Sequence, residues 1–103
     1  MNSDNTLITC IATYGHADEI MGVARQAGAR GGTILGAHGT GTEEDVKFFG
    51  ISLVQQKEII LIVAQNDQVQ AILDAVCGMN IFETPGSGII YTSPVDQFRV
   101  FGC

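Results

Sequence analysis

The 103-residue chain contains no tryptophan, only two prolines and only five lysines and arginines. Eleven aspartates and glutamates oppose those five cations, so the net charge is −6. A surface that neutralises phosphates needs an excess of basic residues, and the composition therefore argues against nucleic-acid binding. No apolar run approaches the ~20 residues of a membrane span, and residues 1–6 are too polar for a signal peptide. We therefore expect a cytoplasmic protein without membrane insertion.

Cysteine and histidine are scarce as well. Cys10, Cys77 and Cys103 are odd in number and form no C-x-x-C pair, which argues against a disulfide framework. Cys10 lies in an apolar run and Cys77 near the end of a predicted helix, so both are expected to be small buried hydrophobes. The two imidazoles, His16 and His38, have no acidic residue at an obvious metal-ligand spacing. The sequence therefore predicts neither a metal site nor a catalytic pair.

The apolar pattern predicts four strands and two helices. Runs of β-branched residues, as in residues 57–64, are typical of strands, whereas apolar residues every three or four positions are typical of helices. The predicted strands span residues 7–14, 33–38, 57–64 and 88–92, and Pro94 is expected to end the last one. The first predicted helix spans residues 17–27. The second begins at a cap formed by Asn66 or Asp67 and ends at Gly78.

This βαββαβ order predicts an α+β, ferredoxin-like fold, in which a four-stranded antiparallel sheet carries two helices on one face. The first and fourth predicted strands show little polar alternation on either side. The face without helices is therefore expected to be covered too, and a second copy of the chain is the expected cover.

Two segments do not fit a plain core of this kind. Residues 39–56 begin with glycines and acidic residues and end with apolar ones. They form either a hairpin extension that covers the sheet or a mobile loop that presents Phe48, Phe49 and Ile51 to a partner protein. Residues 83–88 read ETPGSG, a turn whose backbone N–H groups can cradle an anion. The turn neither opens a helix nor precedes a P-loop lysine, so the standard nucleotide motifs are absent.

Three blocks, residues 29–41, 57–76 and 84–95, resemble the PII nitrogen-regulatory signalling proteins, in a short PII-like form. The resemblance covers nearly the whole chain as one domain, residues 1–103. It implies a homotrimer that binds an adenine nucleotide (AMP, ADP or ATP) between its subunits, as an effector and not as an obligatory cofactor. It also implies a protruding loop over residues 42–56 that controls a target enzyme or transporter, and a signalling function without enzymatic activity.

By position, the resemblance also implies which residues bind the nucleotide. Ile11 and Val63 would pack on the adenine, and Lys57 is one of the few cations left for the phosphates. The backbone of three glycine-rich segments would surround the ligand: Gly31, Gly32 and Thr33 at the adenine, then Gly39, Thr40 and Gly41 on one side of the phosphates and Gly86, Ser87 and Gly88 (within the loop 84–88) on the other.

Several charged residues of the family are missing here. The lysine expected after the second glycine turn is Ile89, and two C-terminal arginines align with Val100 and Gly102. A mono- or diphosphate is therefore expected in preference to ATP. Glu43 replaces the glutamine that holds magnesium and 2-oxoglutarate, so no response to 2-oxoglutarate is expected.

Three other interpretations remain open. In a structural homo-oligomer of the same fold, the glycine turns would serve packing alone. A trimeric metal-tolerance protein would need a cluster of His, Cys and carboxylate residues that this sequence lacks. A small enzyme such as an acylphosphatase would need an arginine and an asparagine near the first strand, and residues 13–17 supply neither.

Overall fold

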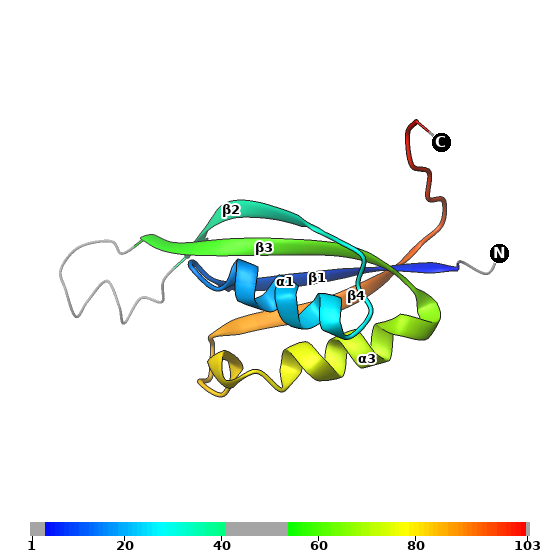
Figure 1. The fold of residues 1–103 in the computed structure, drawn as a ribbon. Coiled ribbons are helices and arrows are strands. Elements are labelled where there is room, and N and C mark those ends of the chain that lie inside the picture. Colours follow the sequence, from blue (N-terminus) through cyan, green and yellow to red (C-terminus); the bar gives the residue numbers. More distant parts are fainter. Residues whose placement is uncertain (1–3, 41–53, 103) are drawn as a thin grey trace.

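The computed structural model describes residues 4–40 and 54–102. Its elements are, in chain order, β1 (Asn5–Thr13), α1 (Ala17–Gln26), β2 (Thr33–Thr40), β3 (Val54–Gln65), α3 (Asn66–Cys77), the 3-10 helix η1 (Asn80–Phe82) and β4 (Gly88–Val95). The strands pair antiparallel in the order β2-β3-β1-β4. Both α-helices lie against the same face of the sheet (Figure 1). The predicted ferredoxin-like fold is confirmed.

The core lies between this sheet face and the helices. Ile8 of β1 pairs with Ile62 of β3, and Cys10 pairs with Ile60. All four side chains are 1% exposed or less. Burial of an aliphatic side chain of this size contributes about 1.5–3 kcal/mol. The helices complete the core with Ala17, Ile20, Met21, Ala24, Ile72 and Val76.

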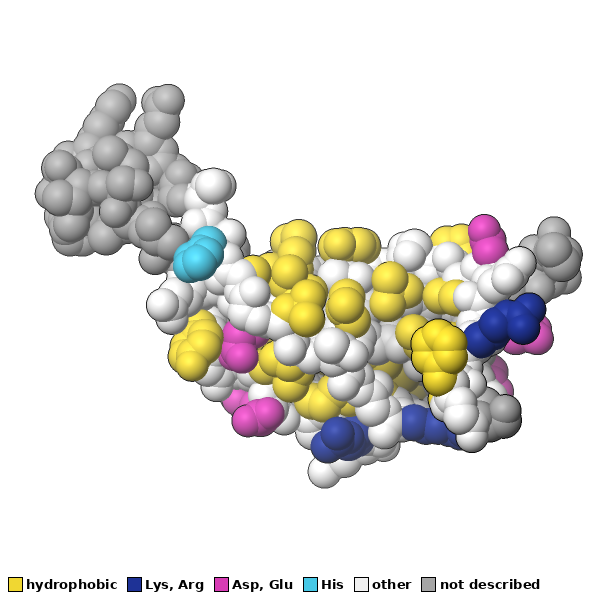
Figure 2. All heavy atoms as spheres, turned by 90° about the horizontal axis from the view of Figure 1, so that it is seen from above, with side chains coloured by type: hydrophobic (Ala, Val, Ile, Leu, Met, Phe, Trp, Pro, Cys, Tyr) yellow, Lys and Arg dark blue, Asp and Glu magenta, His cyan; other side chains and the backbone are white. Residues whose placement is uncertain are grey.

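Neither helix covers the opposite face of the sheet, called the open face below (Figure 1). The register places Thr9 of β1 between Leu61 of β3 and Tyr91 of β4 on this face. Hydrophobic side chains gather along it in Figure 2. Among those on the strands, Leu35 and Tyr91 are 41% and 52% exposed. A contiguous apolar surface of this kind is typical of an interface.

Each strand differs from the sequence prediction at one boundary or more, and the largest differences are at the beginning of β3 and the end of β4. The pairing of β2 with β3 runs to Thr40 and Val54, so residues 54–56 belong to β3 and not to the predicted loop 42–56. Pro94 lies inside β4 and does not end it. Because β4 pairs only with β1, its other side needs no backbone donor, and an edge strand tolerates proline.

The beginning of α3 differs from the prediction as well. Its N-cap residue is Gln65, without a side-chain hydrogen bond to the helix, so the predicted cap at Asn66 or Asp67 is wrong. Asn66 instead accepts a hydrogen bond on its side-chain oxygen from the Thr6 hydroxyl, at 2.6 Å. That bond ties the beginning of the helix to β1. None of the helices in the described residues is long and apolar enough to cross a membrane.

The two described cysteines have different surroundings. Cys10 is buried, as predicted, but Cys77 is exposed, so the expectation that both are buried is wrong for Cys77. Neighbouring residues on a helix point about 100° apart, and Val76, 2% exposed, takes the position that faces the core. Cys77 therefore lies at the edge of the core, where solvent reaches it.

Candidate functional site: a basic cavity at one end of the sheet

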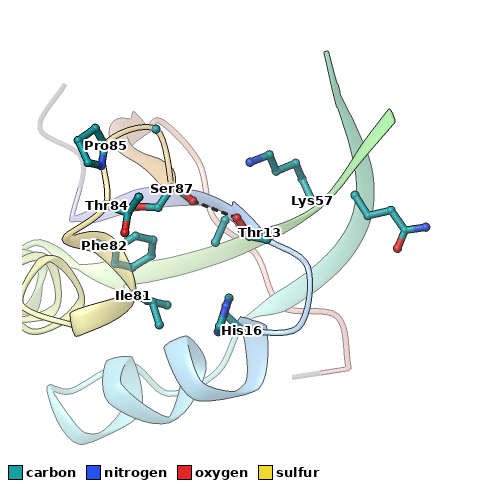
Figure 3. Close-up of a pocket in the computed structure, with 11 residues that line it drawn as sticks. Thr13, His16, Lys57, Ile81, Phe82, Thr84, Pro85 and Ser87 are labelled. Carbon is teal, nitrogen blue, oxygen red and sulfur yellow. Dashed lines mark hydrogen bonds between the residues drawn. The ribbon is translucent and has the colours of Figure 1, made fainter. Parts of the chain in front are cut away.

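A cavity of about 560 Å³ lies where β1, β3 and the turn before β4 meet. Figure 3 shows Lys57 of β3 and the turn residues Thr84 and Ser87 on different sides of it, with His16 on the side of α1. Phe82 forms part of the wall. This is also the end of the sheet at which β2 and β3 lead into and out of residues 41–53.

The turn at residues 84–87 has a defined geometry. The Ser87 N–H donates to the Thr84 carbonyl oxygen at 3.1 Å. Gly86 has a φ of +80°, and Pro85 precedes it, which is the pattern of a type II turn. The Thr13 hydroxyl donates to the Ser87 carbonyl oxygen at 3.5 Å (Figure 3). The glycine turn is thus held against the end of β1 at the rim of the cavity.

The connection between β1 and α1 is fixed in a similar way. The Gly15 N–H donates to a carboxylate oxygen of Glu58 at 2.7 Å, and the Tyr14 N–H donates to the Gln56 carbonyl oxygen at 3.1 Å. These two bonds hold the connection against β3. As a result His16, the residue before α1, is placed at the cavity.

The charges around the cavity favour an anion. Lys57 and His16 line it, and none of the described residues that line it is an aspartate or glutamate. The Nδ1 atom of His16 lies 3.8 Å from Oε2 of Glu19 on α1, a residue that does not line the cavity. In a chain of net charge −6, a cavity whose described lining contains Lys57 and no acidic side chain favours negative ligands. Within the described residues, no group of three or more His, Cys, Asp or Glu could hold a metal ion.

Some of the residues that the sequence predicts for a nucleotide site line this cavity. Lys57, Gly86 and Ser87 line it. Gly88 begins β4 next to the turn. The segment formed by Gly39 and Thr40 ends β2 at the same end of the sheet, whereas Gly41 lies outside the described residues, as do Phe48, Phe49 and Ile51 of the predicted partner-binding loop.

The other predicted residues lie farther along the sheet. Val63 follows Lys57 by six residues on β3, a separation of about 20 Å. Val63 pairs with Leu7, whereas Ile11 pairs with Ile59, so Ile11 and Val63 share the open face without being neighbours. The segment Gly31, Gly32 and Thr33 leads into β2, where Thr33 pairs with Leu61. One chain therefore does not bring all the predicted residues together.

A second cavity, of about 290 Å³, lies in that distant half of the sheet. Val63 lines it together with Arg30 and the tail residues Phe98 and Val100. Sequence reasoning missed Arg30 and Phe98, and at the larger cavity it missed Thr13, His16 and Phe82. The position of His16 directly after Gly15, at the connection from strand to helix, is the signal that could have indicated it.

Comparison with known proteins decides the family. The family model of the nitrogen regulatory protein P-II matches residues 5–101. The chain belongs to the P-II family. Members of this family are regulatory signalling proteins, so the chain is a signalling protein and not an enzyme. A search of curated proteins finds no match to this P-II family chain.

Two solved structures show the same fold. The PII protein of Arabidopsis thaliana, bound to citrate, is 19% identical and has a TM-score of 0.67, over 91% of this chain and 77% of that chain. CPII, a nitrogen regulatory PII-like protein from Thiomonas intermedia K12, is bound to ADP, AMP and bicarbonate. It is 18% identical and has a TM-score of 0.69, over 93% of this chain and 94% of that one.

Proposed function

We propose that this P-II family protein is a cytoplasmic homotrimer that binds an adenine nucleotide in the clefts between its subunits. The observation that carries the proposal is the meeting of Lys57 and the glycine turn 84–87 at a cavity without acidic side chains. Lysine supplies the charge and a glycine turn supplies backbone donors, the two components of a phosphate site. The structurally similar CPII is bound to ADP and AMP.

The separation of the predicted residues favours a site shared between two subunits. Lys57 and the turn 84–87 lie at one end of the sheet, and Val63 lies about 20 Å away along β3. In a symmetric trimer, one subunit supplies the phosphate-binding end and its neighbour supplies the adenine-binding half. The open face provides the apolar surface for that contact.

The output of the protein is proposed to be the loop within residues 42–56, which would contact a target enzyme or transporter through Phe48, Phe49 and Ile51. Its two ends continue from β2 and β3 next to the basic cavity. A nucleotide phosphate that binds there contacts the base of the loop. The bound phosphate stabilises the loop conformation with which it makes better contacts. A ligand shifts a conformational equilibrium in this way.

Calorimetric titration with AMP, ADP and ATP tests the nucleotide site. Lys57→Met is expected to weaken binding of a diphosphate about tenfold or more, because a charge-assisted contact contributes roughly 1.5–3 kcal/mol. Arg25→Met is the matched control: it removes the same charge from the last turn of α1, outside the residues that line the cavity. If no adenine nucleotide binds the wild type, or if both variants lose the same affinity, the nucleotide assignment is wrong.

Light scattering tests the trimer separately. A trimer that binds none of these nucleotides would favour the structural homo-oligomer, in which the glycine turns only serve packing. A monomer of about the chain's own 10.9 kDa at micromolar concentration would exclude the intersubunit site altogether.

A further inference from the structure

Two cysteines line one small cavity on the helix side of the sheet. The cavity has a volume of about 210 Å³ and lies between β1, the end of α3 and the beginning of β4. Cys10 lies in the middle of β1, and Cys77 is the last residue of α3. Its remaining walls are Val76, Phe82, Gly88, Ile89 and Ile90. Neither thiol has a role in the proposed nucleotide site.

The two thiols differ in their access to solvent. Cys10 is 1% exposed, whereas Cys77 is exposed. Burial, with a further contribution from the charge of Cys77, raises the pKa of the Cys10 thiol to about 11. The second cause means that the charge of Cys77 acts on the Cys10 sulfur, so the two residues are electrostatic neighbours as well as neighbours in the same cavity.

We propose that Cys10 and Cys77 form a redox-sensitive pair that a low-molecular-weight disulfide converts to an intramolecular disulfide. The Cys77 thiolate attacks one sulfur of the reagent, and one small thiol leaves. The Cys10 thiol then gives up its proton to solvent, and its sulfur attacks the Cys77 sulfur, which releases the second small thiol. Two protein thiols are oxidised and one small disulfide is reduced to two thiols, so the reaction is balanced.

The order of the two steps follows from the structure. A reagent in solution reacts with Cys77 first, since the exposed thiol is the one that can attack it. The buried Cys10 carries little thiolate at neutral pH, so closure of the bridge is the slow step and becomes faster as the pH rises. Phe82 lines this cavity and also the larger basic cavity. The thiol pair and the proposed phosphate site therefore share a wall.

The test uses the full chain with Cys103→Ser, which removes the third thiol. The protein is incubated with oxidised glutathione, unfolded, alkylated with iodoacetamide and analysed by intact mass and peptide mapping. We expect a product that has lost two hydrogen atoms, takes up no alkyl group and contains a Cys10–Cys77 cross-linked peptide. A non-reducing gel is expected to show a single chain, which distinguishes this bridge from one between subunits.

Two variants separate the steps. Adding Cys10→Ala is expected to stop the reaction at a stable mixed disulfide on Cys77, and adding Cys77→Ser is expected to prevent reaction of the folded protein. Circular dichroism establishes that each variant is folded. A mixed disulfide that persists on Cys77 while Cys10 is present, or two thiols that both remain alkylatable, would overturn the proposal.

Discussion

Gly88 faces the ring of Phe82 so closely that a Cβ atom at residue 88 would lie 2.7 Å from the ring's Cε1 atom. The same Cβ would lie 2.8 Å from the carbonyl oxygen of Ile11. The ring of Phe82 belongs to the wall of both the basic cavity and the thiol cavity. Because residue 88 has no side chain, β4 can begin next to β1 while the ring of Phe82 keeps its position in the two cavity walls.

Gly88→Ala is therefore expected to destabilise the fold by about 1–3 kcal/mol, the usual cost of an overpacked site. The backbone of Ile11 cannot yield without disturbing the pairing of β1 with β4, so the ring of Phe82 must move. Urea unfolding measures the change in the free energy of unfolding.

Gly22→Ala is the matched control for that substitution. A Cβ at residue 22, on the exposed side of α1, meets no atom within 4 Å. Alanine is favoured over glycine in a helix by about 0.8–1 kcal/mol, so the control is expected to be more stable than the wild type. Equal effects of the two substitutions would show that the contact with Phe82 does not constrain residue 88.

The open face is expected to hold the subunits of the proposed trimer together. Tyr91→Glu places a charge opposite Thr9 in the middle of this face, and burying that charge in an interface without a partner is strongly unfavourable. The variant is expected to fold as a monomer or to dissociate at much higher concentration than the wild type. Sedimentation or light scattering measures the mass.

Ala71→Glu provides the comparison for the open face. Residue 71 is exposed on α3, and the helices lie on the other side of the sheet (Figure 1). This variant is expected to keep the wild-type mass. If Tyr91→Glu also keeps it, the open face is not the interface.

The fold was predictable because its signals are local. The β-branched run in β3 and the three- and four-residue spacing in α1 each indicate an element on their own. The boundary at Pro94 was not predictable, because proline ends a central strand but is tolerated in an edge strand. Which strand lies at the edge is a property of the whole sheet. The exposure of Cys77 likewise depends on which side of α3 meets the sheet.

The candidate site was predictable only in part. Lys57 and Gly86 belong to sequence blocks that resemble the P-II family, and these blocks indicated them. His16 and Phe82 reach the cavity only because the Gly15–Glu58 hydrogen bond and the helix η1 place them there. The Gly15–Glu58 hydrogen bond joins residues 43 positions apart, and a contact of that kind leaves no local pattern in the sequence.

The stability of the reduced protein is expected to depend on the Cys10 thiol at alkaline pH. Its pKa is raised to about 11 in the fold, above the ordinary value of about 8.5 for a cysteine in an unfolded chain. Between these values the unfolded state binds fewer protons than the folded state, so the free energy of unfolding falls as the pH rises. The loss is expected to approach about 3 kcal/mol once the pH exceeds both pKa values, since one pKa unit corresponds to about 1.4 kcal/mol.

Cys10→Ala isolates that contribution from other alkaline groups. The variant is less stable throughout, because it loses buried volume, but its stability is expected to fall less steeply between pH 9 and 11. Urea unfolding at several pH values in the presence of reductant measures both slopes. Parallel slopes would mean that Cys10 ionises equally easily in both states.

The final prediction concerns which nucleotide the proposed site prefers. The P-II resemblance places a lysine where this chain has Ile89, directly after Gly88 and the glycine turn. Ile89 is 59% exposed at the beginning of β4, so a longer charged side chain fits there without entering the core. Ile89→Lys is expected to raise the affinity for ATP about tenfold, because a new charge-assisted contact to a phosphate contributes at least about 1.5 kcal/mol. The affinity for AMP, with one phosphate, is expected to change much less.

Ile89→Met is the uncharged control of similar length, and calorimetry compares the three proteins. If the wild type already binds ATP much more tightly than ADP and AMP, then a cation other than the missing one holds the terminal phosphate, and the expected preference for short phosphate chains is wrong.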